Sequence, residues 1–212
     1  ERISWWRHDR FGMFIHFGLY AMPARHEWVR SKEHIPNETY DKKYFPRFNP
    51  DLFDAREWAR AAKKAGMKYM VLTTKHHEGF CMWDTQYTDY KCTNTPAGRD
   101  LVREYVDAFR AEGLKIGFYY SLLDWHHPDF NNDFEAYLDY LYKSVEILCT
   151  NYGKLDILWF DFSYAHMRGE TWKATELMEM VRALQPEVII DNRLEVSGEG
   201  YGSLAECRPT PY

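Results

Sequence analysis

Residues 155–161 read LDILWFD, a short apolar run that ends in a carboxylate. A run of roughly four to eight apolar residues is typical of a strand that is buried on both faces. Because side chains alternate between the two faces of a strand, Trp159 and Asp161 are expected to point in the same direction. The run therefore predicts a buried strand with an indole ring and a carboxylate near its C-terminal end.

Strand-like and helix-like segments alternate along the rest of the chain. Four further segments have the composition of strands, at residues 11–17, 69–74, 116–121 and 188–191. Helices with an apolar side are predicted at residues 51–65, 100–112, 134–152 and 171–184, and residues 18–49 form a long polar and aromatic connection. Apolar strands that alternate with helices predict an α/β fold with a parallel sheet covered by helices.

Two closures of such a sheet are possible, an open doubly wound sheet or an eight-stranded barrel. No glycine-rich phosphate loop follows any of the predicted strands, which disfavours a nucleotide-binding open sheet. A complete barrel takes about 250 residues, and this chain has 212. We therefore expect a partial (β/α)8-like, TIM-type barrel with about five or six βα units, which forms one catalytic domain over residues 1–212.

The composition excludes some classes of partner. A net charge of -5 argues against nucleic-acid binding, because no basic field is present to neutralise phosphates. No stretch approaches the length of a membrane span, and we expect no membrane partner. The four cysteines lack zinc-finger spacing. Aromatic residues make up 17% of the chain, which favours a carbohydrate ligand modestly, since sugar sites use flat rings.

Polar and aromatic side chains follow the predicted strands at the same end. They are His16 after the first strand, His76, His77 and Glu78 after the second, Tyr119, Ser121, Asp124 and Trp125 in and after the third, Trp159 and Asp161 in the fourth, and Asp191 and Arg193 after the fifth. In parallel barrels the C-terminal strand ends build the active site. We therefore expect these groups to share one pocket, whereas Asp156 begins its strand at the opposite end and is expected to serve stability.

Several of these residues also have a structural interpretation. Arg193 could form a structural ion pair, and His16 could be a hydrogen-bonded core histidine. A metal-dependent hydrolase could use His16, His76, His77 and Asp161 as ligands. Adjacent histidines diverge, however, and zinc sites prefer spaced ligands. We therefore predict that the site uses no metal and no cofactor.

The motifs together resemble the α-L-fucosidase family of retaining glycoside hydrolases. The resemblance rests on Trp5-Trp6, residues 11–18 (FGMFIHFG), Glu27-Trp28, residues 74–80 (TKHHEGF), residues 117–121 (GFYYS), residues 158–161 (LWFD) and Asn192-Arg193, which occur in family order. It implies a (β/α)8-like catalytic barrel, often followed by a C-terminal β-sandwich that we expect this chain to lack. It also implies hydrolysis of terminal α-L-fucosyl residues of glycans or glycoconjugates.

The resemblance assigns roles to individual residues. Asp161 would be the nucleophile that forms a covalent fucosyl-enzyme intermediate, and Tyr119 would lie close to it. Glu206 matches the general acid/base of some relatives, whereas in others this residue would fall beyond Tyr212; Glu195 and Glu199 are weaker candidates. The sugar hydroxyls and ring oxygen would be bound by His16, Glu27, His76, His77 and Arg193, and the C5 methyl group would be received by Trp28 and Trp159.

The predicted partner is therefore a fucosylated oligosaccharide or glycoconjugate, in the periplasmic, secreted or lysosomal-type compartment that the family resemblance implies. A deoxyhexose suits this set of side chains, because neutral histidines both donate and accept toward hydroxyl groups and aromatic rings cover a methyl group. Two alternatives stay open: the metal-dependent hydrolase, and a fucose-binding fragment without turnover. The linkage, the aglycone and the oligomeric state are not fixed by the sequence.

Overall fold

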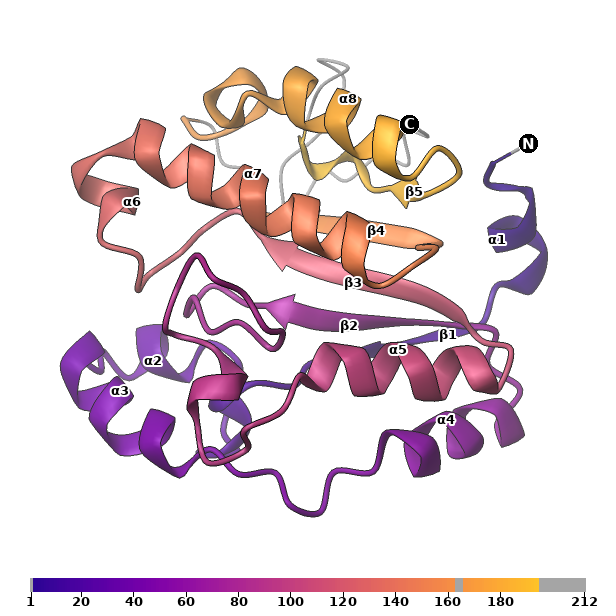
Figure 1. Ribbon diagram of the computed structural model, residues 1–212, viewed down its shortest axis with the longest axis horizontal. Coiled ribbons are helices and arrows are strands. Elements are labelled where there is room, and N and C mark those ends of the chain that lie inside the picture. The colour runs from indigo at the N-terminus through magenta and orange to yellow at the C-terminus, as the bar shows by residue number, and fades with distance from the viewer. Residues whose placement is uncertain (1, 163–165, 195–212) are drawn as a thin grey trace.

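The computed structural model describes residues 2–162 and 166–194. Its centre is a parallel sheet in which five strands follow one another in chain order (Figure 1). The strands are β1 (Gly12–Ile15), β2 (Tyr69–Lys75), β3 (Lys115–Ser121), β4 (Ile157–Asp161) and β5 (Ile189–Ile190). Within the described residues the sheet is open, with β1 and β5 at its edges, and this is consistent with a partial α/β barrel.

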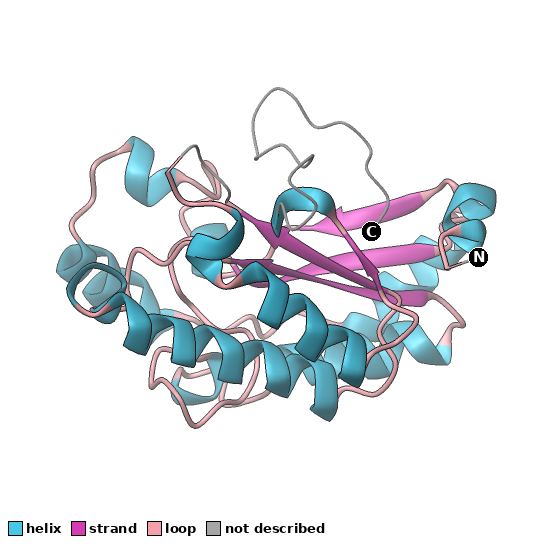
Figure 2. Cartoon of the chain, turned by 90° about the horizontal axis from the view of Figure 1, so that it is seen from above, coloured by secondary structure: helices cyan, strands magenta, loops and turns pink. Residues whose placement is uncertain are grey.

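Four longer helices occupy the predicted positions between the strands. They are α4 (Ala55–Lys64), α5 (Leu101–Ala111), α7 (Phe134–Asn151) and α8 (Ala174–Leu184). Aspartates cap three of them: Asp54 accepts from two backbone amides at the start of α4, Asp100 from one at α5, and Asp133 from one at α7. Figure 2 shows the long helices gathered on one side of the sheet. None of the helices in the described part of the chain combines the length and the apolarity of a membrane span.

The connection predicted for residues 18–49 contains helices that the sequence pattern did not indicate. They are α2 (Val29–Lys32) and α3 (Asn37–Tyr44); two further short helices are α1 (Ser4–Asp9) and α6 (Asp129–Asn132). Isolated helices this short are marginal in water, so tertiary contacts must hold them. Tyr40 of α3 is fully buried and donates a hydrogen bond to the buried carboxyl group of Glu78, a contact without a sequence signature.

The first and last strands are shorter than predicted. His16 and Phe17 lie beyond β1, because the amide of Phe17 donates to the hydroxyl of Thr73 (3.0 Å) instead of continuing the sheet. At the edge, β5 comprises only Ile189 and Ile190, whereas a strand over residues 188–191 was expected.

Two apolar layers flank the sheet. The larger core fills the space between the sheet and the helices. A smaller cluster on the other face contains Val71, Tyr119 and Ile157, with Trp5 and Trp159 packed against it. The arrowheads of β2 and β3 in Figure 1 point to the same end of the sheet, where the loops that carry α2, α3 and α6 also lie. That end is where the predicted polar groups are found.

Candidate active site

Rings that lie in, or directly after, the first four strands converge at the C-terminal end of the sheet. The rings of His76 and Tyr119 stack with centroids 5.4 Å apart, and Tyr119 stacks on Trp159 at the same distance. His16 lies 5.6 Å from His76 and 6.0 Å from Tyr119. The structure therefore brings together residues that lie up to 143 positions apart, from His16 to Trp159.

Asp161 is the last residue of β4, and groups from neighbouring segments hold its carboxylate. The Tyr119 hydroxyl donates to Oδ2 (2.7 Å), and the backbone amide of Phe162 donates to Oδ1 (2.9 Å). Arg193 forms an ion pair with Oδ1, and Nε2 of His77 lies 3.6 Å from Oδ2. The side chain is still 14% exposed. Asp161 thus combines a fixed orientation with access from the outside.

Arg193 follows β5 and contacts two predicted site residues at once. Its guanidinium pairs with Asp161, and its central carbon lies 4.3 Å from the centroid of the Trp159 ring. An arginine over an aromatic face is held by cation–π attraction and keeps its donors free to point sideways. The ion pair that the sequence left open therefore exists, and its partner is the candidate nucleophile.

The three histidines are kept neutral by burial. Burial lowers the pKa of His77 to about 4, although the negative charge of Asp161 opposes this shift. Burial lowers the pKa of His76 well below its ordinary value, helped by His77, and burial likewise lowers that of His16. His77 Nδ1 is hydrogen-bonded to the Ser121 hydroxyl (2.6 Å). In contrast, Nδ1 of His76 is buried without a hydrogen-bond partner among the described residues. Neutral imidazoles can both donate to and accept from hydroxyl groups.

Glu27 and Trp28 lie just before α2. Trp28 meets the His77 ring edge to face (4.9 Å) and also contacts Trp125 (5.4 Å). Glu27 lies 3.5 Å from His26, and its negative charge acts on His16, where it opposes the effect of burial on the pKa. Trp28 therefore lines the His77 side of the site, and Glu27 the His16 side.

Two aromatic residues at the site, Phe14 and Phe162, escaped the sequence prediction, whereas Trp125 was expected there. Phe14 is 40% exposed and contacts Tyr119 and Trp159, and it lies two residues before His16, a spacing that could have revealed it. Trp125 contacts His77 from the loop after β3 (5.5 Å). Phe162 contacts the same ring (5.9 Å) from a backbone with φ of 82°, a strained conformation that no sequence signal indicates.

The remaining predicted residues lie outside this geometry. Glu206, the candidate acid/base, and the alternatives Glu195 and Glu199 fall outside the described residues. His126, in the loop that follows β3, is partly buried and stacks on Tyr90 (3.8 Å). Among residues 2–162 and 166–194, no three His, Cys, Asp or Glu side chains are grouped so as to hold a metal ion.

Glu78 directly follows the histidine pair in the chain. Its carboxyl group is buried and accepts a hydrogen bond from Tyr40. Burial raises its pKa to about 8, although the hydrogen bond from Tyr40 and the charge of Arg30 act in the opposite direction. Between its ordinary pKa near 4.5 and this value, the folded protein binds a proton that the unfolded chain does not. The contribution of Glu78 to stability is therefore present below about pH 4.5 and lost as the pH rises through about 8.

We expect Glu78→Gln to flatten the dependence of stability on pH over this window. Glutamine keeps an acceptor for Tyr40 but cannot ionise. The free energy of unfolding, measured by urea titration, should fall between pH 5 and pH 8 more in the parent than in the variant, by on the order of a few kcal/mol. All other titratable groups are common to both proteins, so the difference between the two curves isolates Glu78. Parallel curves would contradict the assignment.

The comparisons with known proteins all point to the same family. The sequence model described as Alpha-L-fucosidase matches residues 1–207. An alpha-L-fucosidase of Dictyostelium discoideum is 31% identical over 97% of this chain and 50% of its own length. The structure of alpha-L-fucosidase isoenzyme 1 from Paenibacillus thiaminolyticus superposes with a TM-score of 0.88 at 62% identity, covering 92% of this chain and 50% of that one.

A third match is the structure of a covalent reaction intermediate. It is an alpha-L-fucosidase from Bacteroides thetaiotaomicron whose covalent intermediate was trapped with 2-fluoro-fucosyl fluoride, with a TM-score of 0.84, 35% identity, and coverage of 91% of this chain and 48% of that one. This chain spans about half the length of the relatives that it matches here.

Proposed function

The chain belongs to the α-L-fucosidase family, and on that premise we propose that the protein hydrolyses terminal α-L-fucosyl residues with retention of anomeric configuration. The observation that supports this most is the environment of Asp161. Its carboxylate is oriented by Tyr119 and Arg193, is partly exposed, and is flanked by His77. A carboxylate fixed in this way can attack an anomeric carbon, which the retaining mechanism requires.

The reaction would proceed in two displacements. Asp161 attacks the anomeric carbon while a carboxylic acid protonates the departing glycosidic oxygen, which gives a fucosyl-Asp161 ester. Water, deprotonated by the same second carboxyl group, then cleaves the ester and restores Asp161. We propose Glu206 for the second carboxyl group on the strength of the resemblance. Retention requires the two carboxyl groups to lie about 5 to 5.5 Å apart, against roughly 6.5 to 9.5 Å for inversion.

Polar side chains would bind the hydroxyl groups of the sugar, and aromatic side chains would bind its methyl group. The neutral rings of His16, His76 and His77 offer donors and acceptors to the hydroxyl groups. Trp159 and Trp28 cover the C5 methyl group, and we add the exposed ring of Phe14, which contacts Trp159, to this apolar wall. A hydroxyl group on that methyl carbon would then lose hydration without gaining a partner.

The test is hydrolysis of an aryl α-L-fucoside by the complete gene product, followed by proton NMR. We expect α-L-fucose as the first product, unchanged rates in EDTA, and much slower hydrolysis of the matched aryl α-L-galactoside, which differs only by the C6 hydroxyl group. Release of β-L-fucose first would contradict retention. Loss of activity in EDTA would favour the metal-dependent hydrolase, and binding of fucose without release of the aryl group would favour a binding fragment.

A further inference from the structure

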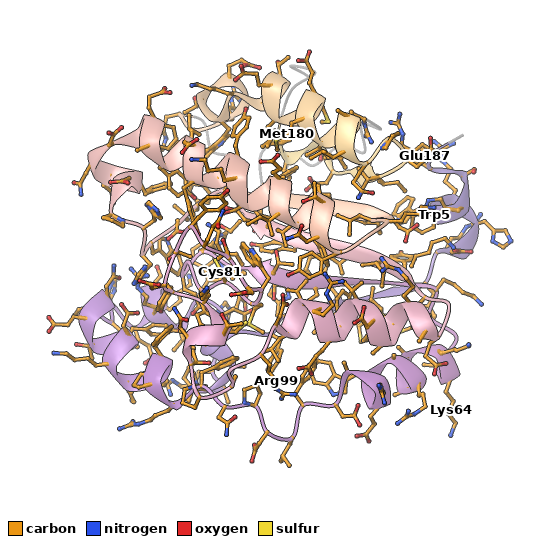
Figure 3. The ribbon with its side chains drawn as sticks, in the orientation of Figure 1. Trp5, Lys64, Cys81, Arg99, Met180 and Glu187 are labelled. Carbon is orange, nitrogen blue, oxygen red and sulfur yellow. The ribbon has the colours of Figure 1, made fainter. Side chains whose placement is uncertain are left out.

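A buried ion pair lies behind the candidate site, between the sheet and α7. Nζ of Lys75 is 2.9 Å from Oδ2 of Asp124, and the two side chains are 0% and 2% exposed. The ammonium group lies 4.7 Å from the centroid of the Tyr120 ring and 5.8 Å from that of Tyr137. Cys81, labelled in Figure 3, belongs to the same interior layer and is fully buried. A pair so enclosed gives little net stability, because desolvation offsets its attraction.

The pair coincides with an irregularity in β2. The register with β3 runs regularly to the pairing of Thr73 with Tyr119 and then shifts, so that Lys75 pairs with Tyr120. The hydroxyl of the intervening Thr74 donates to the carbonyl of Tyr119 (2.7 Å). Bulges re-aim the side chains that follow them. Here the shift turns Lys75 toward the helix layer, and the histidine pair that follows it lies at the end of the sheet.

Asp124 organises the loop after β3. Its Oδ1 accepts from the backbone amides of His126 (2.9 Å) and His127 (2.8 Å), while Oδ2 faces Lys75. Burial alone would raise the pKa of Asp124, but the charge of Lys75 and these amides outweigh it and leave the pKa below its ordinary value. Gly79 allows the approach: its φ is +86°, and a Cβ atom there would lie 2.4 Å from Oδ1 of Asp124.

Trp125, which follows Asp124, connects three loops of the site. Its amide donates to the carbonyl of His77 (2.8 Å). Its own carbonyl accepts from Arg30 of α2 (3.0 Å) and from Asn37, the first residue of α3 (2.8 Å). Its ring contacts those of His77 and Trp28. A displacement of this loop would therefore move both His77 and Trp28.

We propose that Lys75 and Asp124 are positioning residues for sugar binding: by fixing the backbone around Trp125, the pair holds His77 and Trp28 in place in the candidate site that contains Asp161. The inference rests on the proposed function for its kinetic consequence, and on the hydrogen bonds above for its structural one. Neither residue touches the candidate nucleophile. Misplacement of binding groups by about 1 Å can cost about 100-fold in rate, even when the altered residue lies away from the chemistry.

The experiment compares Lys75→Met, Asp124→Asn and the double variant Lys75→Met/Asp124→Leu in the complete gene product. Removing one partner leaves a buried charge unpaired, so both single variants should lose stability and about 100-fold in kcat/KM. The double variant has no buried charge and should regain the parent's melting temperature. It still lacks the acceptor for the amides of His126 and His127, so its kcat/KM should stay low. Recovery of both quantities together would overturn the proposal.

A matched control and a second measurement separate this proposal from the proposed function. Lys115 is the first residue of β3, and its Nζ lies 3.0 Å from Oδ2 of Asp9. It is therefore also a strand lysine paired with an aspartate, but at the opposite end of the sheet. Lys115→Met should leave kcat/KM unchanged. Amide hydrogen exchange over residues 122–128 should be faster in the double variant than in the parent, whatever the substrate. Unchanged exchange in the double variant would overturn the positioning role. If the parent had no fucosidase activity but the double variant still exchanged faster than the parent, only the proposed function would be overturned.

Discussion

Asp161→Ala is expected to lower kcat/KM for an aryl α-L-fucoside by on the order of 10⁴-fold, the scale seen when a member of a covalent catalytic group is removed. Without the carboxylate no glycosyl ester can form, and the remaining binding groups cannot supply a nucleophile. The fold should persist, because the Asp161 side chain is partly exposed and its loss leaves only the buried hydroxyl of Tyr119 and the partly exposed Arg193 without this partner. Steady-state kinetics together with circular dichroism provide the measurement.

The matched control lies on the same segment of chain. Asp156 precedes β4 at the other end, where its Oδ2 accepts from the amide of Ile116 (2.9 Å). Asp156→Asn removes the same charge as the Asp161 variant yet keeps an acceptor, so kcat/KM should stay close to that of the parent. An Asp161→Ala variant within about tenfold of the parent, equivalent to only about 1.4 kcal/mol, would show that Asp161 is not the nucleophile.

Arg193→Met should have the second largest effect, a loss of about 100-fold in kcat/KM. The guanidinium pairs with Oδ1 of Asp161 and lies over Trp159, so its removal leaves a mostly buried carboxylate without its ion pair and Trp159 without its cation–π partner. The side chains are 17% and 14% exposed, and solvent screening keeps the loss below that of a fully buried pair. Methionine preserves much of the length and apolar volume of the stem.

Two further arginine variants serve as comparisons for Arg193→Met. Arg193→Lys keeps the charge but loses the planar fork and the stacking on Trp159, and it should fall between the parent and Arg193→Met. Arg182→Met removes an arginine of α8 that donates to the carbonyl of Val188, and it should leave the kinetics unchanged. If Arg193→Met kept the parent's kcat/KM while Arg182→Met lost activity, the role given to the Asp161–Arg193 pair would be wrong.

The sequence predicted the parts of the molecule that follow from local periodicity. The run at residues 155–161 identified β4 and placed Trp159 and Asp161 on one face, and the structure has Arg193 in contact with both. Parallel strands bring their C-terminal ends to one edge, so polar residues after successive strands were expected to meet. The ring contacts among His16, His76 and Tyr119 agree with that expectation.

The features that escaped prediction depend on contacts between distant segments. The short helices α2 and α3 are held by partners such as Glu78 and the carbonyl of Trp125, which no local pattern reveals. The register shift after Thr73 arises from pairing with β3 and decides that Lys75 faces the helices. Trp125 was visible in the sequence as a loop residue, but its backbone links to His77 and Arg30 exist only in the folded chain.

Trapping the glycosyl ester shows which carboxylate is the nucleophile. The complete gene product is inactivated with 2-fluoro-fucosyl fluoride, digested with pepsin, and the labelled peptide is sequenced by mass spectrometry. We expect one fluorofucosyl adduct, on the carboxylate of Asp161. The adduct should be absent from Asp161→Ala and present in Asp156→Asn. An adduct on any other carboxylate, or turnover of aryl fucoside by a protein in which no adduct forms at Asp161, would contradict it.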